Sequence, residues 1–382
     1  MRRLALLLAV VALLACSAPP PAAPLTSPPS PTSQAASDAA APPSGWDAIV
    51  AAAHNENTLI LDNGAAAAGQ TVLDAFQAKY PWLQVQVTTL QASQFTARAM
   101  TEQRNGLFAW DLLLGAGFNN VDQVLAPAGA VGDVRPILAD LPADVKDDAK
   151  WAGGFLWLRS DTSPDSLVTD LGAQWGVYVN RQQIPADQLS SISQLTDPKF
   201  KGKIVIYNPN SSGAGSQTLA NILSHTDEAF VTRIMTDQAP AYTMDSNQAS
   251  QFLAEGRYPI AIGVTASSLQ PFTSQGLGSQ VEPLREEANS FMHASGFTVM
   301  KNAPHPNAMK VFLSWFLSQE GQNTWNQSSV TAASRRLDVT VTNPDAQPDW
   351  AHLQDYKVIF DTPSGNDLLQ HMLQIAATAH PT

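Results

Sequence analysis

The sequence predicts an α/β protein whose folded body forms two lobes with a ligand cleft between them. Short apolar runs alternate with segments of helical periodicity along the chain, which is typical of α/β folds. The stretch that follows residue 45 exceeds the usual size of a single domain, so two lobes are expected. Several apolar runs also end in loops of small residues, and open α/β sheets bind ligands in such loops.

The N-terminus predicts export and membrane anchoring. The basic start "MRR" and the apolar run "LALLLAVVALLA" form a secretory signal over residues 1–15, because the run is shorter than the about 20 residues that a membrane span needs. It ends in "LLAC", which resembles a bacterial lipoprotein signal with the lipid on Cys16, the only cysteine of the chain. The alternative is an ordinary signal peptide followed by a chance cysteine.

Residues 16–45 are predicted to be an extended tether. They are mostly Pro, Ala and Ser, and Asp38 is their only charge. Such a segment cannot bury enough apolar surface to fold, and at about 3.1 Å per residue it can reach on the order of 90 Å. We therefore expect a leash between a lipid anchor in the cell membrane and an extracytoplasmic folded body.

Charge and composition exclude several classes of partner. The formal net charge is −12 and no run of Lys or Arg occurs, which excludes nucleic acid. No two of the seven histidines have the spacing of metal ligands on a helix and no HExxH occurs, so we predict neither a metal site nor a cofactor. A monomer is expected.

The first part of the folded body predicts the βαβαβ start of a doubly wound domain. Strands are expected at 57–63, 83–89 and 110–117 because these runs are apolar or alternate. Helices are expected between them, one stopped by Pro81 and one running from Ser93 to Gly106. Right-handed crossovers then give a parallel sheet.

The remainder of the body continues the alternation. Strands are expected at 175–180, 203–207, 258–264 and 295–300, with a loop or short helix at 192–203 and a helix near 216–235. A strong amphipathic helix is expected from Pro306 to Gly321. Its apolar face comprises Ala308, Val311, Phe312, Trp315 and Phe316.

Loops rich in Gly, Ala, Ser and Asn follow four of the strands, at 61–69, 113–119, 207–215 and 262–268. The third contains "NPNSSGAGSQTL" (208–219), in which Ser211 or Ser212 can cap the following helix. The helix start then favours a ligand oxygen, or the cap forms and nothing binds. A nucleotide loop is not expected, because the Gly-Lys-Ser/Thr ending is missing and Thr218 stands at the third glycine of G-x-G-x-x-G.

Several motifs in this order support a family resemblance: "LTDPKFKGKI", "YNPNSSGAG", "FLAEGRYPIAIG" and "SGFTVMKNAPHPNAMKVFLSWFLSQEGQ". From about Thr58 to Arg336 the body resembles the type II periplasmic solute-binding proteins of ABC importers, in the branch of the ferric-iron-binding proteins. The resemblance implies two α/β lobes joined by crossing strands, which close on a solute without chemistry and present it to a permease. We expect lobe 1 at about 46–133 and 297–345, and lobe 2 at about 134–296 and 346–382.

The iron-binding members of this family carry two adjacent tyrosines at positions that fall near Ala266 and Ser267. Their histidine and acid ligands correspond to the loops "NGAAAAG" and "GAGFN", which contain neither residue type. Ferric ion prefers phenolate and carboxylate oxygens, so iron is not expected as the ligand.

A small organic or oxyanionic solute is expected instead. Hydroxyl and backbone groups of the four loops would bind it, Phe118 and Trp157 would form an apolar wall, and Arg335 would pair with an acid group. Trp157 as a core residue and Arg335 as a surface ion pair are the alternatives. The predicted ligand residues are Asn63, Gly64, Gly115, Ala116, Gly117, Phe118, Trp157, Ser211, Ser212, Gly213, Ala214, Thr265, Ala266, Ser267 and Arg335.

No catalytic residue is predicted. Two alternatives to a transport receptor stay open on the same fold. One is a surface-anchored hydrolase with Ser212 as nucleophile, although no G-x-S-x-G occurs at a strand-to-helix turn. The other is a sensory module that passes the state of its ligand to a partner.

Overall fold

A computed structural model describes residues 44–380, except for 65, 91, 116–117, 160–162, 330–332, 343–345 and 356–357. The predictions for the signal, for Cys16, for nearly all of the tether and for Ala116 and Gly117 therefore lie outside the described residues. Residues 43–382 form one compact unit. In the described part of the chain, no helix combines the length and the apolar character that a membrane crossing requires.

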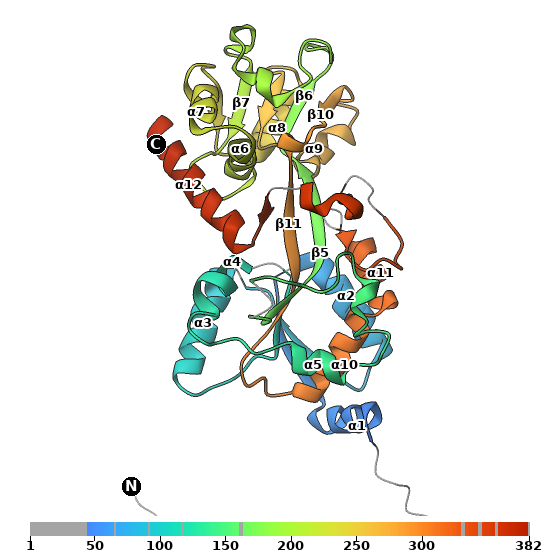
Figure 1. Cartoon of the computed structure of the whole chain (residues 1–382). Helices are drawn as coiled ribbons and strands as arrows, with labels where there is room; N and C mark the ends of the chain where they lie inside the picture. Colours follow the sequence, from blue (N-terminus) through green and yellow to red (C-terminus); the bar gives the residue numbers. More distant parts are fainter. Residues whose placement is uncertain are drawn as a thin grey trace, which may run out of the picture. The chain divides into compact units, whose positions relative to one another are not determined.

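Helices and strands alternate along most of this unit (Figure 1). The helices are α1 (Trp46–Glu56), α2 (Ala66–Lys79), α3 (Ala92–Arg104), α4 (Phe118–Asn120), α5 (Arg135–Asp140), α6 (Ala214–His225), α7 (Glu228–Thr236), α8 (Ser246–Ala254), α9 (Ala266–Thr273), α10 (Pro306–Phe316), α11 (Gln319–Ser328) and α12 (Pro363–Ala379). The strands are β1 (Thr58–Asn63), β2 (Gln84–Thr88), β3 (Leu112–Gly115), β4 (Leu156–Trp157), β5 (Ser166–Trp175), β6 (Val177–Asn180), β7 (Ile204–Tyr207), β8 (Ala241–Thr243), β9 (Ile260–Ile262), β10 (Val281–Pro283), β11 (Ser290–Val299), β12 (Ala333–Ser334) and β13 (Ile359–Phe360).

The first sheet has the order β12-β5-β11-β3-β1-β2, with β13 beside β11 and β4 beside β5. Strand β1 pairs in parallel with β2 and β3, which confirms the parallel βαβαβ start, whereas β11 runs antiparallel to β3 and β5. Both faces of β3 are covered: Leu112 and Leu114 join one hydrophobic cluster and Leu113 joins another. A strand buried on both faces is expected to be a continuous apolar run, as "LLL" is.

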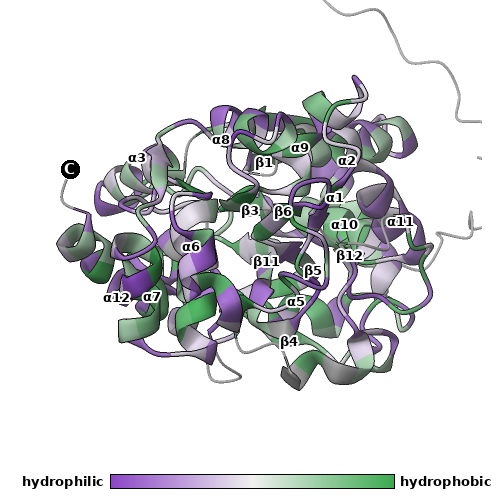
Figure 2. Cartoon of the chain, turned by 90° about the horizontal axis from the view of Figure 1, so that it is seen from above, coloured by the Kyte–Doolittle hydropathy of each residue, from purple (hydrophilic) through white to green (hydrophobic). Residues whose placement is uncertain are grey.

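The second sheet has the order β10-β6-β9-β7-β8. Strand β7 pairs in parallel with both β8 and β9, while β6 is antiparallel to β9. Helices α6, α7 and α12 supply the core on one face, with Ile204, Ile206 and Ile260 from the strands. Seen from above, helix ribbons show both green and purple segments, as expected of helices with one buried face (Figure 2).

Strands β5 and β11 run between the two sheets (Figure 1). They pair with each other along their length, with a bulge between Ser295 and Gly296. Buried Asn289, directly before β11, bonds to the start of β6 and to the residue after β10: its Oδ1 accepts from Val177 N at 2.7 Å, and its Nδ2 donates to Leu284 O at 2.8 Å.

The hydrophobic clusters show that the chain passes from the first sheet to the second later than the expected boundary at residue 134. Val134, Leu138 and Trp151 are buried in a cluster of the first sheet, together with Leu167. At the other end of the chain, α12 is buried against the second sheet through Leu369, Met372 and Ile375. Residues such as Val134 and Leu167, expected in lobe 2, thus pack with the first sheet, and the second sheet takes its first strand from Val177 onwards.

Two long helices of the sequence prediction are each broken in two. The helix expected near 216–235 is interrupted at Thr226, and Asp227 starts α7 by accepting Phe230 N at 2.7 Å. The helix expected from Pro306 to Gly321 ends at Phe316, and Ser318 caps α11, in whose first turn Gly321 lies. A Cβ at Gly321 would collide with the backbone oxygens of Trp315 and Phe316, so glycine permits the close turn instead of ending the helix.

Candidate ligand site

The small-residue loops after β7 and β9 lie at one edge of the second sheet. The two strands are parallel neighbours, so their carboxyl ends meet there, and helices α6 and α9 begin from these loops. The loops also touch: a Cβ at Gly263, whose φ is +88°, would lie 2.5 Å from the Cα of Gly215. Residue 263 therefore requires glycine for two reasons: its backbone is left-handed, and the Cα of Gly215 leaves no room for a Cβ.

The start of α6 has no side-chain cap among the residues that the structure describes. Residue Gly213 occupies the N-cap position, and the first helical hydrogen bond runs from Gln217 N to Gly213 O at 2.9 Å. The N–H groups of Ala214, Gly215 and Ser216 precede that bond. They form an N-terminus of the kind that binds ligand oxygens.

The prediction that Ser211 or Ser212 caps α6 is wrong. Asn208 Nδ2 donates to Ser211 Oγ at 2.6 Å, and the buried side chain of Ser216 binds the turn from the helix side. Ser216 Oγ accepts from Gly213 N at 3.2 Å and donates to Ser211 O at 2.8 Å. A serine four positions after Ser212 could have suggested this arrangement, but the choice between the serines depends on the path of the turn.

The two glycines of the "SSGAG" turn have different roles. A Cβ at Gly215 would collide with the carbonyl oxygen of Tyr207 at the end of β7. A Cβ at Gly213 would meet only the ring of Tyr207, at 3.9 Å, and the φ of 163° at Gly213 is extended backbone that any residue adopts. Gly215 is thus required for packing, whereas Gly213 leaves open space at the helix start.

The start of α9 is closed by its own side chains. Thr265 Oγ1 accepts from Ser268 N at 3.3 Å, and Ser268 Oγ accepts from Thr265 N at 3.0 Å, which is a capping box. Ser267 Oγ lies 2.9 Å from Thr265 Oγ1, and both Ala266 and Ser267 are exposed. Of the predicted ligand side chains on this loop, Ser267 is the one with an exposed hydroxyl.

In the first lobe, Gly64 and Gly115 lie at the carboxyl ends of the parallel neighbours β1 and β3. The two loops are joined by a hydrogen bond from Gly64 N to Leu114 O at 2.9 Å. Asn63 is only 1% exposed and its side chain lies against Gly69 of α2. Phe118 is likewise buried, in the cluster around α3, so backbone rather than these two side chains is available at this edge.

The structure places Trp157 and Arg335 in packing roles. Trp157 is half-buried on β4 beside Phe155, with ring centroids 6.3 Å apart. Arg335 is 2% exposed, and its guanidinium donates to Val168 O at 2.9 Å, to Gly154 O at 2.8 Å and to Ala152 O. The guanidinium is occupied by three carbonyls, which conflicts with its predicted pairing to a solute acid and with a surface location.

Arg335 lies beside Asp170 of β5, and burial affects both groups. Desolvation raises the pKa of Asp170 to about 7, partly offset by hydrogen bonds and by Arg335. It lowers the pKa of Arg335 to about 10, although the Asp170 carboxylate acts in the opposite direction. Through Val168 O the Arg335 guanidinium holds β5, a role that sequence reasoning could not assign because it depends on burial.

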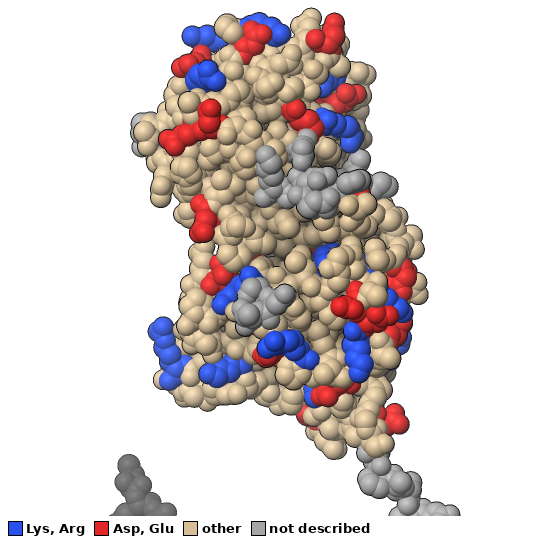
Figure 3. All heavy atoms as spheres, viewed as in Figure 1, with Lys and Arg blue, Asp and Glu red and all other residues tan. Residues whose placement is uncertain are grey.

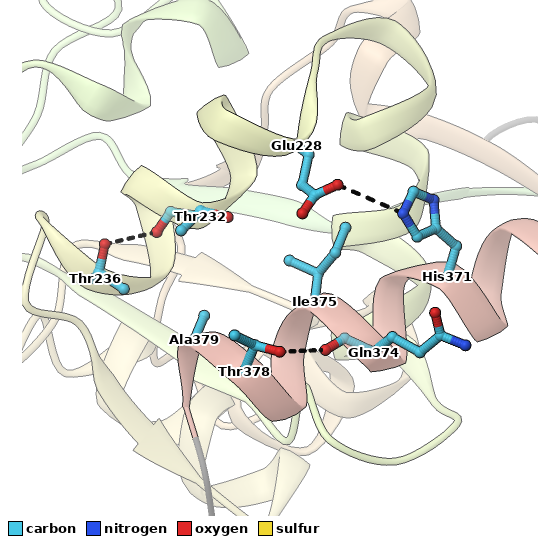
Figure 4. Close-up of a pocket in the computed structure, with 8 residues that line it drawn as sticks. All are labelled: Glu228, Thr232, Thr236, His371, Gln374, Ile375, Thr378 and Ala379. Carbon is cyan, nitrogen blue, oxygen red and sulfur yellow. Dashed lines mark hydrogen bonds and ion pairs between the residues drawn. The ribbon is translucent and has the colours of Figure 1, made fainter.

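A groove of about 470 Å³ lies between α7 and α12 and contains none of the predicted ligand residues (Figure 4). Its lining comprises Glu228, Thr232, Thr236, His371, Gln374, Ile375, Thr378 and Ala379. The Thr236 and Thr378 hydroxyls donate to carbonyls of their own helices, and His371 lies 3.6 Å from Glu228 at the rim. Across the described residues, no group of three or more His, Cys, Asp or Glu is arranged to hold a metal ion.

This architecture, with two mixed sheets and two crossing strands, defines the class of the protein: a two-lobed periplasmic binding protein fold of type II. The chain matches the family of bacterial extracellular solute-binding proteins over residues 58–328. The chain therefore belongs to that family.

Solved structures support the fold. Iron-bound HitA from Pseudomonas aeruginosa is 19% identical with a TM-score of 0.59, over 85% of this chain and 99% of HitA. AfuA from Actinobacillus pleuropneumoniae with bound fructose-6-phosphate is 19% identical with a TM-score of 0.54, over 84% of this chain and 98% of AfuA. At such identities the likeness concerns the fold and leaves the ligand open.

A curated relative, an uncharacterized protein of Haemophilus influenzae, is 27% identical over 138 residues, or 35% of this chain. The chain spans about 39% of the length of that relative.

Proposed function

We propose that this protein is an extracytoplasmic receptor that captures a small organic or oxyanionic solute by lobe closure and delivers it to an ABC import permease. Membership of the solute-binding family supports the transport role. The observation that carries the choice of solute is the uncapped start of α6. Closure of two lobes around a ligand is the usual way in which such hinged proteins bind.

An oxyanion suits the α6 start for two reasons. The N–H groups of Ala214, Gly215 and Ser216 are donors, and the helix dipole places partial positive charge at the same point. The exposed hydroxyl of Ser267 on the adjacent loop adds a further polar group. A phosphate or carboxylate on a small organic molecule would use all of these groups.

Ferric ion suits the site poorly. The loop after β9 offers Thr265, Ala266 and Ser267, and the loops after β1 and β3 contain no His, Asp or Glu between residues 63–69 and 115–119. Hydroxyl and amide groups are weak ligands for a hard trivalent cation. The iron named for HitA is therefore not proposed for this chain, whereas the sugar phosphate named for AfuA gives a useful first probe.

The N-terminus would fix the receptor to the cell. We propose that lipidated Cys16 anchors it to the membrane and that residues 16–45 form the tether. On the face shown in Figure 3, positive and negative side chains are scattered among broad uncharged areas.

Thermal shift tests the proposal. Fructose 6-phosphate, inorganic phosphate, citrate, a polyamine, thiamine and ferric ion are each added to the folded chain, since a ligand of the native state raises Tm. We expect a shift with at least one phosphate or carboxylate, and its loss in Gly213→Ala but not in the control Ser274→Ala, an exposed position of the same lobe. A shift with ferric ion alone would overturn the choice of solute.

A further inference from the structure

The chain continues beyond the part that matches the family, from residue 329 onwards. This extension contains β13, which pairs with the crossing strand β11 at Met292 and His293, and then α12. Helix α12 packs along α6 and α7, the first of which starts at the ligand turn 208–213 (Figure 1). The extension thus connects the crossing strands with the helix that carries the candidate site.

The end of α12 contacts the ligand turn directly. Asn210 Nδ2, in the middle of the turn, donates to the His380 carbonyl at 2.8 Å. The ring of His380 stacks on Tyr242 of β8, with centroids 3.7 Å apart and planes 6° apart. Tyr242 is itself fixed, because its Oη donates to Met235 O at 2.6 Å.

These contacts add to the local hydrogen bonds of the turn, which include the bond from Asn208 Nδ2 to Ser211 Oγ within it. At its start, Asn208 N donates to Thr243 O at 2.8 Å, and at its finish Ser216 Oγ donates to Ser211 O at 2.8 Å. Within the turn, Pro209 is buried and Asn210 is half-buried, whereas Ser211 and Ser212 are exposed. Asn210 is the residue of that segment that a distant part of the chain binds, 170 positions away.

We propose that Asn210 and His380 are positioning residues, through which the C-terminal extension holds the ligand turn in the pose that binds solute. The inference rests on the proposed function of this turn. A turn ordered before binding loses less freedom when the solute arrives, so the contact between α12 and the turn raises affinity without touching the ligand. The extension is then a part of the site that lies outside the family's matched region.

The test uses Asn210→Ala, which removes the donor, and His380→Ala, which removes the stacked ring but keeps the carbonyl. The control is His371→Ala, on the same helix, exposed and paired only with Glu228. Hydrogen–deuterium exchange of the ligand-free chain is measured for the amides of 210–216. We expect exchange there about fivefold faster or more in both test variants, with unchanged exchange in the rest of α6 and in the control.

Calorimetric titration with fructose 6-phosphate supplies the second measurement. We expect Kd to rise about three- to tenfold in both test variants, and Tm without ligand to stay within about 2 °C of the wild type. Unchanged exchange at 210–216, a uniform increase over all of α6, or an equal effect of His371→Ala would each overturn the positioning role. If the wild-type protein does not bind fructose 6-phosphate, the choice of this solute is wrong. The exchange measurement then still decides whether Asn210 and His380 position the turn.

Discussion

Helices α6 and α9 start at the same edge of the same sheet, and in each a serine of the first turn accepts from the N–H of the N-cap residue. They differ in the N-cap residue itself, which has a capping side chain at α9 but not at α6. At α9, Thr265 and Ser268 form a reciprocal cap. At α6, the N-cap residue is Gly213, and buried Ser216 binds the turn from within. Two helix starts of similar composition therefore differ in the backbone N–H groups that they offer to a ligand. At α9 a side chain of the N-cap residue accepts from the first turn, whereas at α6 the first turn has no such acceptor.

The difference shows that a serine-rich loop does not by itself indicate a capped helix or a binding site. Both loops contain hydroxyl residues just before the helix, and each was expected to contribute to the ligand site. The position of the hydroxyl relative to the first turn decides between the two outcomes. Four substitutions would break or sharpen this comparison.

The largest effect is expected for Gly215→Ala, because the added Cβ would overlap the Tyr207 carbonyl at the end of β7. Forcing α6 away from the strand should lower the free energy of unfolding by about 3 kcal/mol or more. Urea denaturation measures it, with Gly213→Ala as the matched control, which should change stability by less than about 1 kcal/mol. Equal destabilisation by both alanines would show that the two glycines do not have separate roles.

The next effect is expected for Gly213→Asp, which gives α6 the cap that it lacks. The new carboxylate should accept hydrogen bonds from the N–H groups of the first turn of α6. It should thereby raise the free energy of unfolding of the ligand-free protein by about 1 kcal/mol. It should also make the binding free energy of an anionic solute less favourable by about 1.5–3 kcal/mol, which raises Kd roughly 10- to 100-fold. Calorimetry with whichever anion shifts Tm measures it, and an unchanged Kd would remove α6 from the site.

A smaller effect is expected for Thr265→Ala, which opens α9. The lost hydroxyl leaves the N–H of Ser268 without its cap, so the free energy of unfolding should fall by about 1 kcal/mol. Thermal unfolding with and without ligand checks this. The ligand-induced rise in Tm should persist, and its complete loss would mean that Thr265 contacts the solute.

The smallest effect is expected for Ser267→Ala. This side chain is exposed, so the free energy of unfolding should change by no more than about 0.5 kcal/mol. A single neutral hydrogen bond to the solute is worth about 0.5–1.5 kcal/mol, so Kd should rise roughly two- to tenfold. A larger loss than that of Gly213→Asp would reverse the assignment of the two helix starts.

Local pattern was enough to predict most of the strands. The parallel set β1, β2 and β3 could be predicted because each is an apolar or alternating run bounded by turn residues. Strand β5 was not predicted, because "SLVTDLGAQW" mixes Asp170, Gly172 and Gln174 with apolar residues. Its polar members are tolerated because Arg335 and other distant residues surround them, which no local window shows.

The location proposed for the site follows from the fold class, whereas the surroundings of its residues do not. The carboxyl ends of strands follow from the fold class, and the glycine-rich loops mark them. Whether Arg335 binds a ligand or backbone carbonyls depends on its burial. Whether the Asn210 side chain has a hydrogen-bond partner depends on a residue 170 positions away. Neither fact is present in local spacing.

The order of strands also sets the order in which the chain can fold. The second sheet uses a continuous stretch, β6 to β10, whereas the first sheet places β11 between β3 and β5. Its N-terminal strands therefore cannot join β5 until residues 290–299 exist, some 175 positions after β3 by the printed bounds. Such long-range pairing is slow to form. A chain threaded across a membrane from its N-terminus would thus complete its first sheet only after residues 290–299 had crossed.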